Sequence, residues 1–251
     1  VVDWVKGDYA ASLRVAELLY QEARERGDWW AVWDALQGLL LNAAVFGLEP
    51  ELEATVQQAM LEAAEVGAWR DLALLRSDYG NALMVAGRLE DAKRELEATL
   101  HNLREMGERA RLGHVLFNLG FTLLELGDLE YSQLTLEESV RLWRNRKEYR
   151  HTARSLAALA LNHLRAGKRK EAQQISAEAF ELRASWALGI YDLPLVLYIR
   201  ARALGDPQGS AYLRETQQLL HNLAQQLPPP LAERLLKNRY VAWALSKTAG
   251  V

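Results

Sequence analysis

The sequence predicts an all-α protein, a right-handed α-solenoid of antiparallel helix pairs that repeats every forty residues. Two observations carry this prediction. Between regularly placed glycines, apolar residues lie three and four positions apart, as at Leu96, Leu100 and Leu103, which is the spacing of one helix face. The glycines themselves recur every twenty residues, at Gly7, Gly27, Gly47, Gly67, Gly87, Gly107 and Gly127, and again at Gly167.

Each of these glycines follows an apolar helical run and is expected to end it, because glycine enters the left-handed conformation without a Cβ clash. Lys147 interrupts the series, and after Ala187 it is lost. Asp8, Asp28 and Asp128 come directly after a turn glycine, where an aspartate caps the next helix. The chain is therefore predicted to run helix, tight turn, helix, over most of its length.

The two helices of each pair differ in character. Residues 87–106 and 127–146 have a narrow apolar stripe, whereas residues 67–86 and 107–126 are apolar over a wider arc. The wider helices are expected to lie between neighbours, and such a pair must stack on copies of itself to bury its apolar surface.

Small residues at fixed places in these pairs resemble the tetratricopeptide repeat. In that family a small residue lies seven positions before the turn glycine and another lies five after it, so that the paired helices pack closely. The matching residues are Gly80, Gly87 and Ala92; Gly120, Gly127 and Ser132; and Ala160, Gly167 and Ala172. The pair around Gly47 departs from the pattern, with Leu40 and Leu52 at the small positions.

The period of forty residues exceeds the thirty-four of the common tetratricopeptide repeat. It resembles the longer, MalT-like repeats of bacterial transcriptional activators and signalling ATPases. We expect residues 1–186 to form the repeats, and residues 187–251 to form an irregular helical repeat and a capping helix of the same solenoid. In the second range, Asp192 is expected to cap a helix whose first turn contains Pro194. The opening letters VVDWVKG are typical of the end of a helix, which suggests a fragment of a larger protein.

Composition narrows the function. The formal charge is −3 and no cysteine is present, which leaves no thiolate chemistry and no global field toward nucleic acid. Apolar runs are too short to span a bilayer, so a cytoplasmic protein without a membrane partner is expected. The five histidines are scattered, and neither the HExxH nor the phosphate-loop pattern occurs. We therefore expect no catalysis, no metal and no cofactor.

Charge is distributed unevenly along the chain. Residues 1–66 carry twelve acidic and four basic side chains, whereas residues 141–170 carry ten basic and one acidic. Three interpretations are open: a solvated face, a surface for an acidic peptide, protein or second copy of the chain, and, least favoured, a nucleic-acid surface. The basic patch comprises Arg141, Arg144, Arg146, Lys147 and Arg150.

The resemblance also implies a concave binding groove, lined by the first helix of each pair, at about 28–46, 68–86, 108–126 and 148–166. Alignment on the turn glycines places the following residues in it: Asp34, Gln37, Leu41, Leu74, Ser77, Asn81, His114, Phe117, Asn118, Phe121, Arg154, Ala157 and Leu161. Asn81, Asn118 and Arg154 match three places at which some family members grip a peptide carboxylate. Ser77 and Ala158 depart from that pattern.

Aromatic residues crowd the start of the chain, at Trp4, Trp29, Trp30 and Trp33. Trp69 and Tyr149 share the repeat phase of Trp29, which favours a packing role; the other interpretation is a surface that another domain or a second copy covers.

The leading functional prediction is a protein or peptide interaction module within a larger bacterial transcriptional or signalling regulator. The alternative is a sensor that binds a small effector in the groove and controls oligomerisation.

Overall fold

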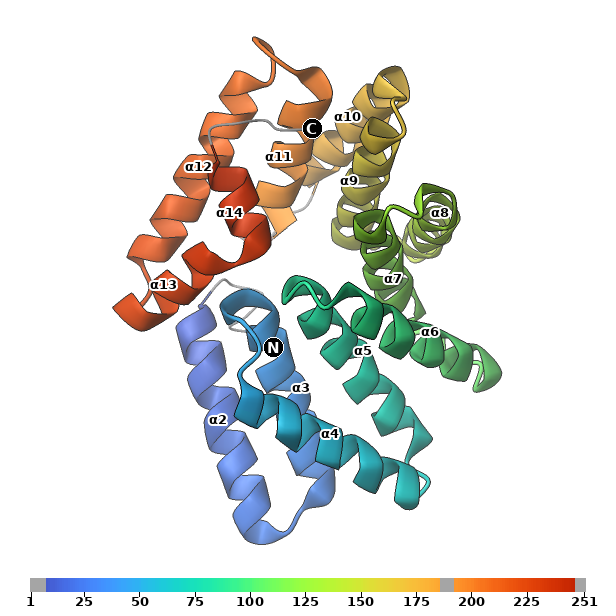
Figure 1. Ribbon diagram of the computed structural model, residues 1–251, viewed down its shortest axis with the longest axis vertical. Helices are drawn as coiled ribbons and strands as arrows, with labels where there is room; N and C mark the ends of the chain where they lie inside the picture. The colour runs from blue at the N-terminus through green and yellow to red at the C-terminus, as the bar shows by residue number, and fades with distance from the viewer. Residues whose placement is uncertain (1–7, 186–191, 247–251) are drawn as a thin grey trace. The chain divides into compact units, whose positions relative to one another are not determined.

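The computed structural model describes residues 8–185 and 192–246, and all regular secondary structure in these ranges is helical (Figure 1). Trp4, Gly7 and Ala187 lie outside the described residues. The helices are α2 (Tyr9–Arg26), α3 (Trp29–Phe46), α4 (Pro50–Glu65), α5 (Trp69–Val85), α6 (Leu89–Glu105), α7 (Leu112–Leu126), α8 (Leu129–Asn145), α9 (Tyr149–Arg165), α10 (Arg169–Ser185), α11 (Asp192–Leu204), α12 (Ser210–Gln225), α13 (Pro229–Lys237) and α14 (Arg239–Leu245).

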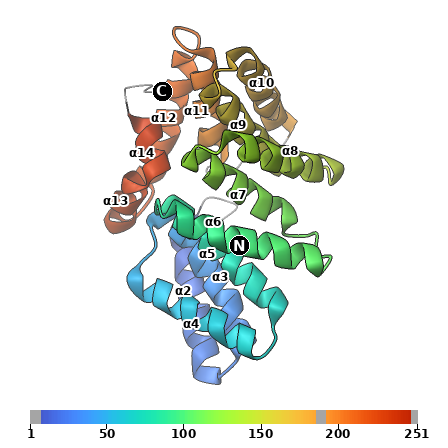
Figure 2. The ribbon, with the colours of Figure 1, turned by 45° about the vertical axis from the view of Figure 1, so that its right-hand side comes forward.

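The chain forms two compact units. The first comprises the residues up to Val115 together with Leu227–Arg239, and the second comprises Leu116–Gln226 together with the residues from Tyr240 onward. Within each unit, successive helices pack as antiparallel pairs, as the ribbons of Figures 1 and 2 show for α5 with α6 and for α9 with α10. The all-α solenoid architecture is thus confirmed.

The turns have the predicted form. Gly27, Gly67, Gly87, Gly107, Gly127 and Gly167 have φ between 65° and 86°, and the residue after each donates to the carbonyl five positions earlier. Lys147 takes the same left-handed conformation with φ of 59°, so the twenty-residue turn persists where its glycine is missing. The carboxylates of Asp8, Asp28 and Asp128 accept from the backbone N–H three positions on, as caps do.

The small residues produce close helix crossings. A Cβ added to Gly120 of α7 would lie 2.7 Å from Leu136 Cγ of α8, and one added to Gly80 of α5 would lie 2.8 Å from Leu96 Cγ of α6. Ser132 Oγ also donates to the Gly120 carbonyl at 2.7 Å. Glycine is therefore needed at these crossings for backbone approach, which offsets its poor helix propensity of about 1 kcal/mol.

The pair around Gly47 is built differently. Leu40 is fully buried at the position of Gly80 and Gly120, and α4 packs chiefly on α5 rather than on α3. Gly47 has φ of 93° and ψ of 152°, and α4 begins only at Pro50. Two large leucines, Leu40 and Leu52, stand where the other pairs have small residues, so α3 and α4 cannot approach as those pairs do.

The C-terminal end of α3 is capped by α13, which follows in the chain almost two hundred residues later. Asn238 Nδ2 donates to the carbonyls of Ala44 and Val45, at 3.2 and 3.1 Å. Arg234 donates to the carbonyls of Phe46 and Gly47 and forms an ion pair with Glu49. These bonds satisfy carbonyls that the last turn of a helix otherwise leaves without partners.

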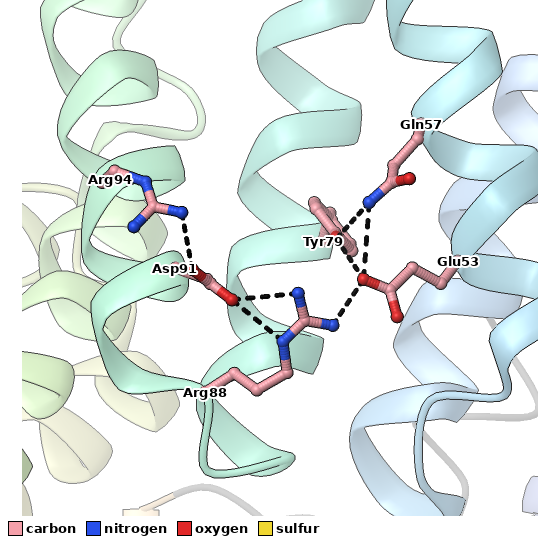
Figure 3. A network of polar contacts seen from close by, with 6 residues as sticks. All are labelled: Glu53, Gln57, Tyr79, Arg88, Asp91 and Arg94. Atoms are coloured by element: carbon pink, nitrogen blue, oxygen red, sulfur yellow. Dashed lines mark hydrogen bonds and ion pairs between the residues drawn. The ribbon is translucent and has the colours of Figure 1, made fainter.

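Helix α4 is held on its other face by a polar network (Figure 3). Glu53 accepts from Tyr79 Oη at 2.6 Å and from Arg88, which also bonds Asp91 in the first turn of α6. Burial raises the pKa of Glu53, but the bonds from Tyr79 and Arg88 outweigh it and lower the pKa. Burial and the bond to Glu53 raise the pKa of Tyr79 to about 12. The network ties α4 to α5 and α6 in place of contacts with α3.

Two details correct the sequence predictions. The helix expected over about 108–126 begins at Leu112, because Ala110 N donates to the Glu108 carboxylate and a turn takes the place of the first helical residues. Asp192, predicted to cap the next helix, is instead buried as its first residue, and its carboxylate pairs with Arg150.

Trp29, Trp30 and Trp69 are 51, 61 and 56% exposed, so the packing interpretation fails at these three positions and the surface interpretation stays a prediction. Only Trp33 is buried, at 3%. Tyr149, which shares their phase, is 37% exposed. The common phase of Trp29, Trp69 and Tyr149 therefore marks a recurring surface position rather than a core position.

Candidate functional site

The predicted groove residues divide between the two units. Asp34, Gln37, Leu41, Leu74, Ser77, Asn81 and His114 belong to the first, and Phe117, Asn118, Phe121, Arg154, Ala157 and Leu161 belong to the second. In the first unit the structure joins Gln37 to Asp78 through Arg111, and the buried Ser77 immediately precedes Asp78 on α5.

This cluster, called here the polar cluster, comprises Gln37 of α3, Ser77 and Asp78 of α5, and Arg111 in the turn before α7. Arg111 donates to both carboxylate oxygens of Asp78, at 3.2 and 3.4 Å, and to Gln37 Oε1 at 2.9 Å. Gln37, Ser77 and Asp78 are buried, and Arg111 is half-buried. One cation thus joins two helices that successive repeats supply.

Two polar atoms of the cluster stand out. Gln37 Nε2 and Ser77 Oγ are buried and have no hydrogen-bond partner among the residues that the structure describes. A buried polar group without a partner costs about 1–3 kcal/mol, and such groups concentrate at sites that bind something. Burial raises the pKa of Asp78 to about 6, against the opposing charge of Arg111. Two buried polar atoms of the cluster therefore lack the hydrogen bonds that a bound partner would supply.

The other predicted residues of the first unit are placed differently. Asp34 is exposed, Leu41, Asn81 and His114 are half-buried, and Leu74 is buried. Of these, His114 meets the polar cluster through its backbone N–H, which donates to the Arg111 carbonyl at 3.0 Å. Two members of the cluster, Gln37 and Ser77, were among the predicted groove residues. The sequence prediction missed Arg111 and Asp78. The signal that could have found them is that each is a charged residue beside an apolar helical run.

In the second unit the predicted groove residues are largely covered by the chain itself. The rings of Phe117 and Phe121 stack with centroids 5.9 Å apart, and Tyr240 of α14 contacts Phe121 edge-on at 5.3 Å. The guanidinium of Arg154 lies 3.9 Å from the Phe117 ring centroid. Asn118 and Leu161 are each 7% exposed and Ala157 is 1% exposed. The expectation of an open groove at Phe117 and Phe121 is therefore corrected, because α14 packs there.

The basic patch is only partly a free surface. Arg150 is half-buried in its ion pair with Asp192, and Arg144 pairs with Glu178 of α10. Arg141, Arg146 and Lys147 are exposed, and Arg146 lies over the Trp143 ring at 5.8 Å. The His151 ring lies against the Trp143 ring, with centroids 4.5 Å apart, and burial and the neighbouring Arg154 lower the pKa of His151 to about 4. An acidic partner at the exposed part of this patch stays a prediction.

A feature that the sequence interpretation missed is a cavity of about 400 Å³ in the first unit, between α2, α3 and the start of α4. Leu52 lines it, and Leu40 lies fully buried in the adjacent helix α3. The departure of Leu40 and Leu52 from the small-residue pattern could have indicated it. Two helices that large side chains keep apart, here α3 and α4, leave space beside them.

No protein-family model matches the sequence, and no curated protein matches it either. The fold does match solved structures. One is the crystal structure of BtubC (BKLC) from P. vanneervenii, with a TM-score of 0.67, 17% identity, and coverage of 88% of this chain and 94% of that one. Another is a Rap protein complexed with Competence and Sporulation Factor, with a TM-score of 0.63, 15% identity, and coverage of 90% and 70%.

These similarities define the class: the chain has a tetratricopeptide-like helical-repeat fold. Within the described ranges, no helix is both long and apolar enough to cross a membrane.

Proposed function

We propose that this chain is a non-catalytic interaction module that binds a protein or peptide partner through the polar cluster. We propose further that it belongs to a larger bacterial transcriptional or signalling regulator of the kind that carries MalT-like repeats. The observation that supports binding is the pair of buried atoms without partners, Gln37 Nε2 and Ser77 Oγ.

A peptide supplies what these atoms lack. Its backbone presents a carbonyl acceptor at every residue and an N–H donor at nearly every residue. Gln37 Nε2 needs an acceptor, and Ser77 Oγ can take either role. Arg111 and Asp78 add one group of each sign beside them. An extended segment that passes the cluster would satisfy both orphan atoms at once.

The comparison supports this proposal, because the Rap protein with the same fold was solved in complex with Competence and Sporulation Factor. The alternative is a small effector enclosed near His114, Phe117, Phe121 and Arg154. It has less support, because the rings of Phe117 and Phe121 already pack on each other and Tyr240 packs on Phe121. Self-association through the exposed Trp29 and Trp30 is a separate prediction, which sedimentation equilibrium over a concentration series would test.

The test begins with a displayed library of short random peptides selected on the immobilised chain. Recovered peptides are labelled, and their affinity is measured by fluorescence anisotropy for the parent chain and for the double variant Gln37→Leu, Ser77→Ala. Losing two hydrogen bonds of about 0.5–1.5 kcal/mol each predicts a Kd about five- to a hundredfold higher. The control, Gln174→Leu, changes an exposed glutamine of α10 and should leave the Kd unchanged.

Circular dichroism before each measurement confirms that the variants are folded. Failure to enrich any peptide over an unrelated immobilised protein would contradict the proposal. Equal affinity of the double variant and the parent chain would contradict the assignment of the site.

A further inference from the structure

The cavity between α2, α3 and α4 is a second site, separate from the polar cluster. Leu39 lines the cavity, whereas Gln37 belongs to the polar cluster. At 100° per residue these two side chains leave α3 about 160° apart, on opposite sides of the helix. The cavity volume of about 400 Å³ falls in the range of pockets that hold small ligands or single large side chains.

The walls of the cavity are apolar. Leu13 of α2, Leu36 and Leu39 of α3, and Leu52 of α4 line it. Phe46 at the end of α3 also lines it. A ligand that fills this space must therefore carry an apolar body.

The floor contains a polar atom without a partner. Asn42 is 1% exposed and lines the cavity. Its Nδ2 donates to Gly38 O at 2.9 Å and to Ser12 Oγ at 3.3 Å, which fixes the amide and leaves Oδ1 buried without a donor. Asn42 Oδ1 is thus a buried acceptor on a lining residue that lacks a donor among the described residues, and a ligand N–H group would satisfy it.

The rim is acidic. Glu17, Glu49 and Glu51 line it, against the single cation Arg234. Arg234 is already engaged by Glu49 and by the carbonyls of Phe46 and Gly47, which leaves Glu17 and Glu51 to attract a positive charge. The first 66 residues carry the same sign, with twelve acidic and four basic side chains. A cleft lined by one sign of charge concentrates ligands of the other sign.

We propose that this cavity binds an organic cation, an amine or guanidinium group carried on an apolar body, with the N–H donors directed to Asn42 Oδ1 and to the rim carboxylates. The cation can be a free amine or a lysine or arginine side chain of a partner. The site exists because Leu40 and Leu52 keep α3 and α4 from closing, while the Glu53–Tyr79–Arg88 network holds α4 from behind.

Isothermal titration calorimetry on the whole chain tests the proposal with three probes. Phenethylamine carries a cation on an apolar ring, phenethyl alcohol has the same shape without the charge, and acetyl-Leu-Arg-Leu-amide presents a guanidinium on a peptide. We expect saturable binding of at least one cationic probe, and binding of the alcohol that is weaker by tenfold or more. Tighter binding of the peptide identifies a partner side chain as the source, and tighter binding of the amine identifies a free ligand; either supports the site.

Two variants locate the binding. Glu17→Gln with Glu51→Gln removes two exposed rim charges and should weaken the cationic probe by about fivefold or more. Thr55→Arg places a resident cation at the rim and should abolish saturable binding. Glu130→Gln, an exposed carboxylate of α8 in the second unit, is the matched control and should leave affinity unchanged.

Equal binding of amine and alcohol, no saturation by either cationic probe, or unchanged affinity in the rim variants would each overturn the proposal. None of these results bears on the polar cluster, whose test uses other variants and other probes.

Discussion

Replacing Gly120 by alanine probes the close crossing of α7 and α8. On an exposed helix the substitution stabilises by about 1 kcal/mol, because alanine has the higher helix propensity. Here the added Cβ would lie 2.7 and 2.9 Å from Leu136 Cγ and Cδ2, and 3.3 Å from the Leu136 backbone nitrogen. Over-packing of this kind costs about 1–3 kcal/mol, so a net destabilisation of up to about 2 kcal/mol is expected.

Another crossing in the same chain has a larger residue in place of the glycine and a smaller residue in place of the leucine. Alanine stands at the equivalent position 160, and the residue sixteen positions later is Ser176, where the other crossings have Leu96 and Leu136. Gly120→Ala should therefore become neutral or stabilising when it is made in a Leu136→Ser background. The four members of this double-mutant cycle are compared by urea denaturation followed by circular dichroism.

A coupling free energy of at least about 1 kcal/mol between the two substitutions is expected. If Gly120→Ala raised the free energy of unfolding by about 1 kcal/mol in both backgrounds, the crossing would be loose and the packing explanation of the small-residue pattern would be wrong.

Other substitutions test the remaining physical claims. Lys147→Gly should stabilise by about 1 kcal/mol, since the lysine is held in the left-handed conformation; unchanged urea midpoints would argue against strain there. Because burial raises the folded-state pKa of Asp78 to about 6, this carboxyl binds its proton more tightly when folded, so its contribution to stability is lost as pH rises from about 4 to 6. Asp78→Asn should remove about 3 kcal/mol of that dependence in denaturation at several pH values, and an unaltered slope would count against it. Arg234→Ala should cost about 1–3 kcal/mol and speed amide exchange in the last turn of α3, by freeing the carbonyls of Phe46 and Gly47; protection equal to that of the parent chain would refute the capping role.

The repeating architecture could be predicted because its causes are local. A turn glycine, an aspartate cap and a small residue at a crossing each act within about twenty residues of themselves, and each occurs at a fixed spacing. Lys147 shows how firmly the packing holds the turn, since it adopts φ of 59° without the glycine that the pattern calls for.

The features that could not be predicted depend on contacts between distant segments. Asn238 caps α3 from 194 positions away, and Tyr240 covers Phe121, which removes it from the groove that the repeat pattern implies. Asp192 pairs with Arg150 forty-two positions earlier and so leaves its predicted capping place. Spacing along the chain carries no information on these contacts.

The polar cluster is an intermediate case. Gln37 and Ser77 followed from alignment on the turn glycines, because repeats place equivalent positions on one face. Arg111, which joins Gln37 of α3 to Asp78 of α5, lies in a turn that the repeat pattern had assigned to a helix, so these bonds could not be foreseen.

The central claim, that the chain binds a partner through the polar cluster, is tested most directly by NMR. Side-chain amide spectra are recorded while the tightest peptide from the library selection is titrated into the chain. Binding at the polar cluster predicts a large, saturable shift of the Gln37 Nε2 resonance, with the indole resonances of the exposed Trp29 and Trp30 unchanged. Shifts confined to those indoles, with Gln37 unmoved, would contradict it and assign binding to the aromatic surface instead.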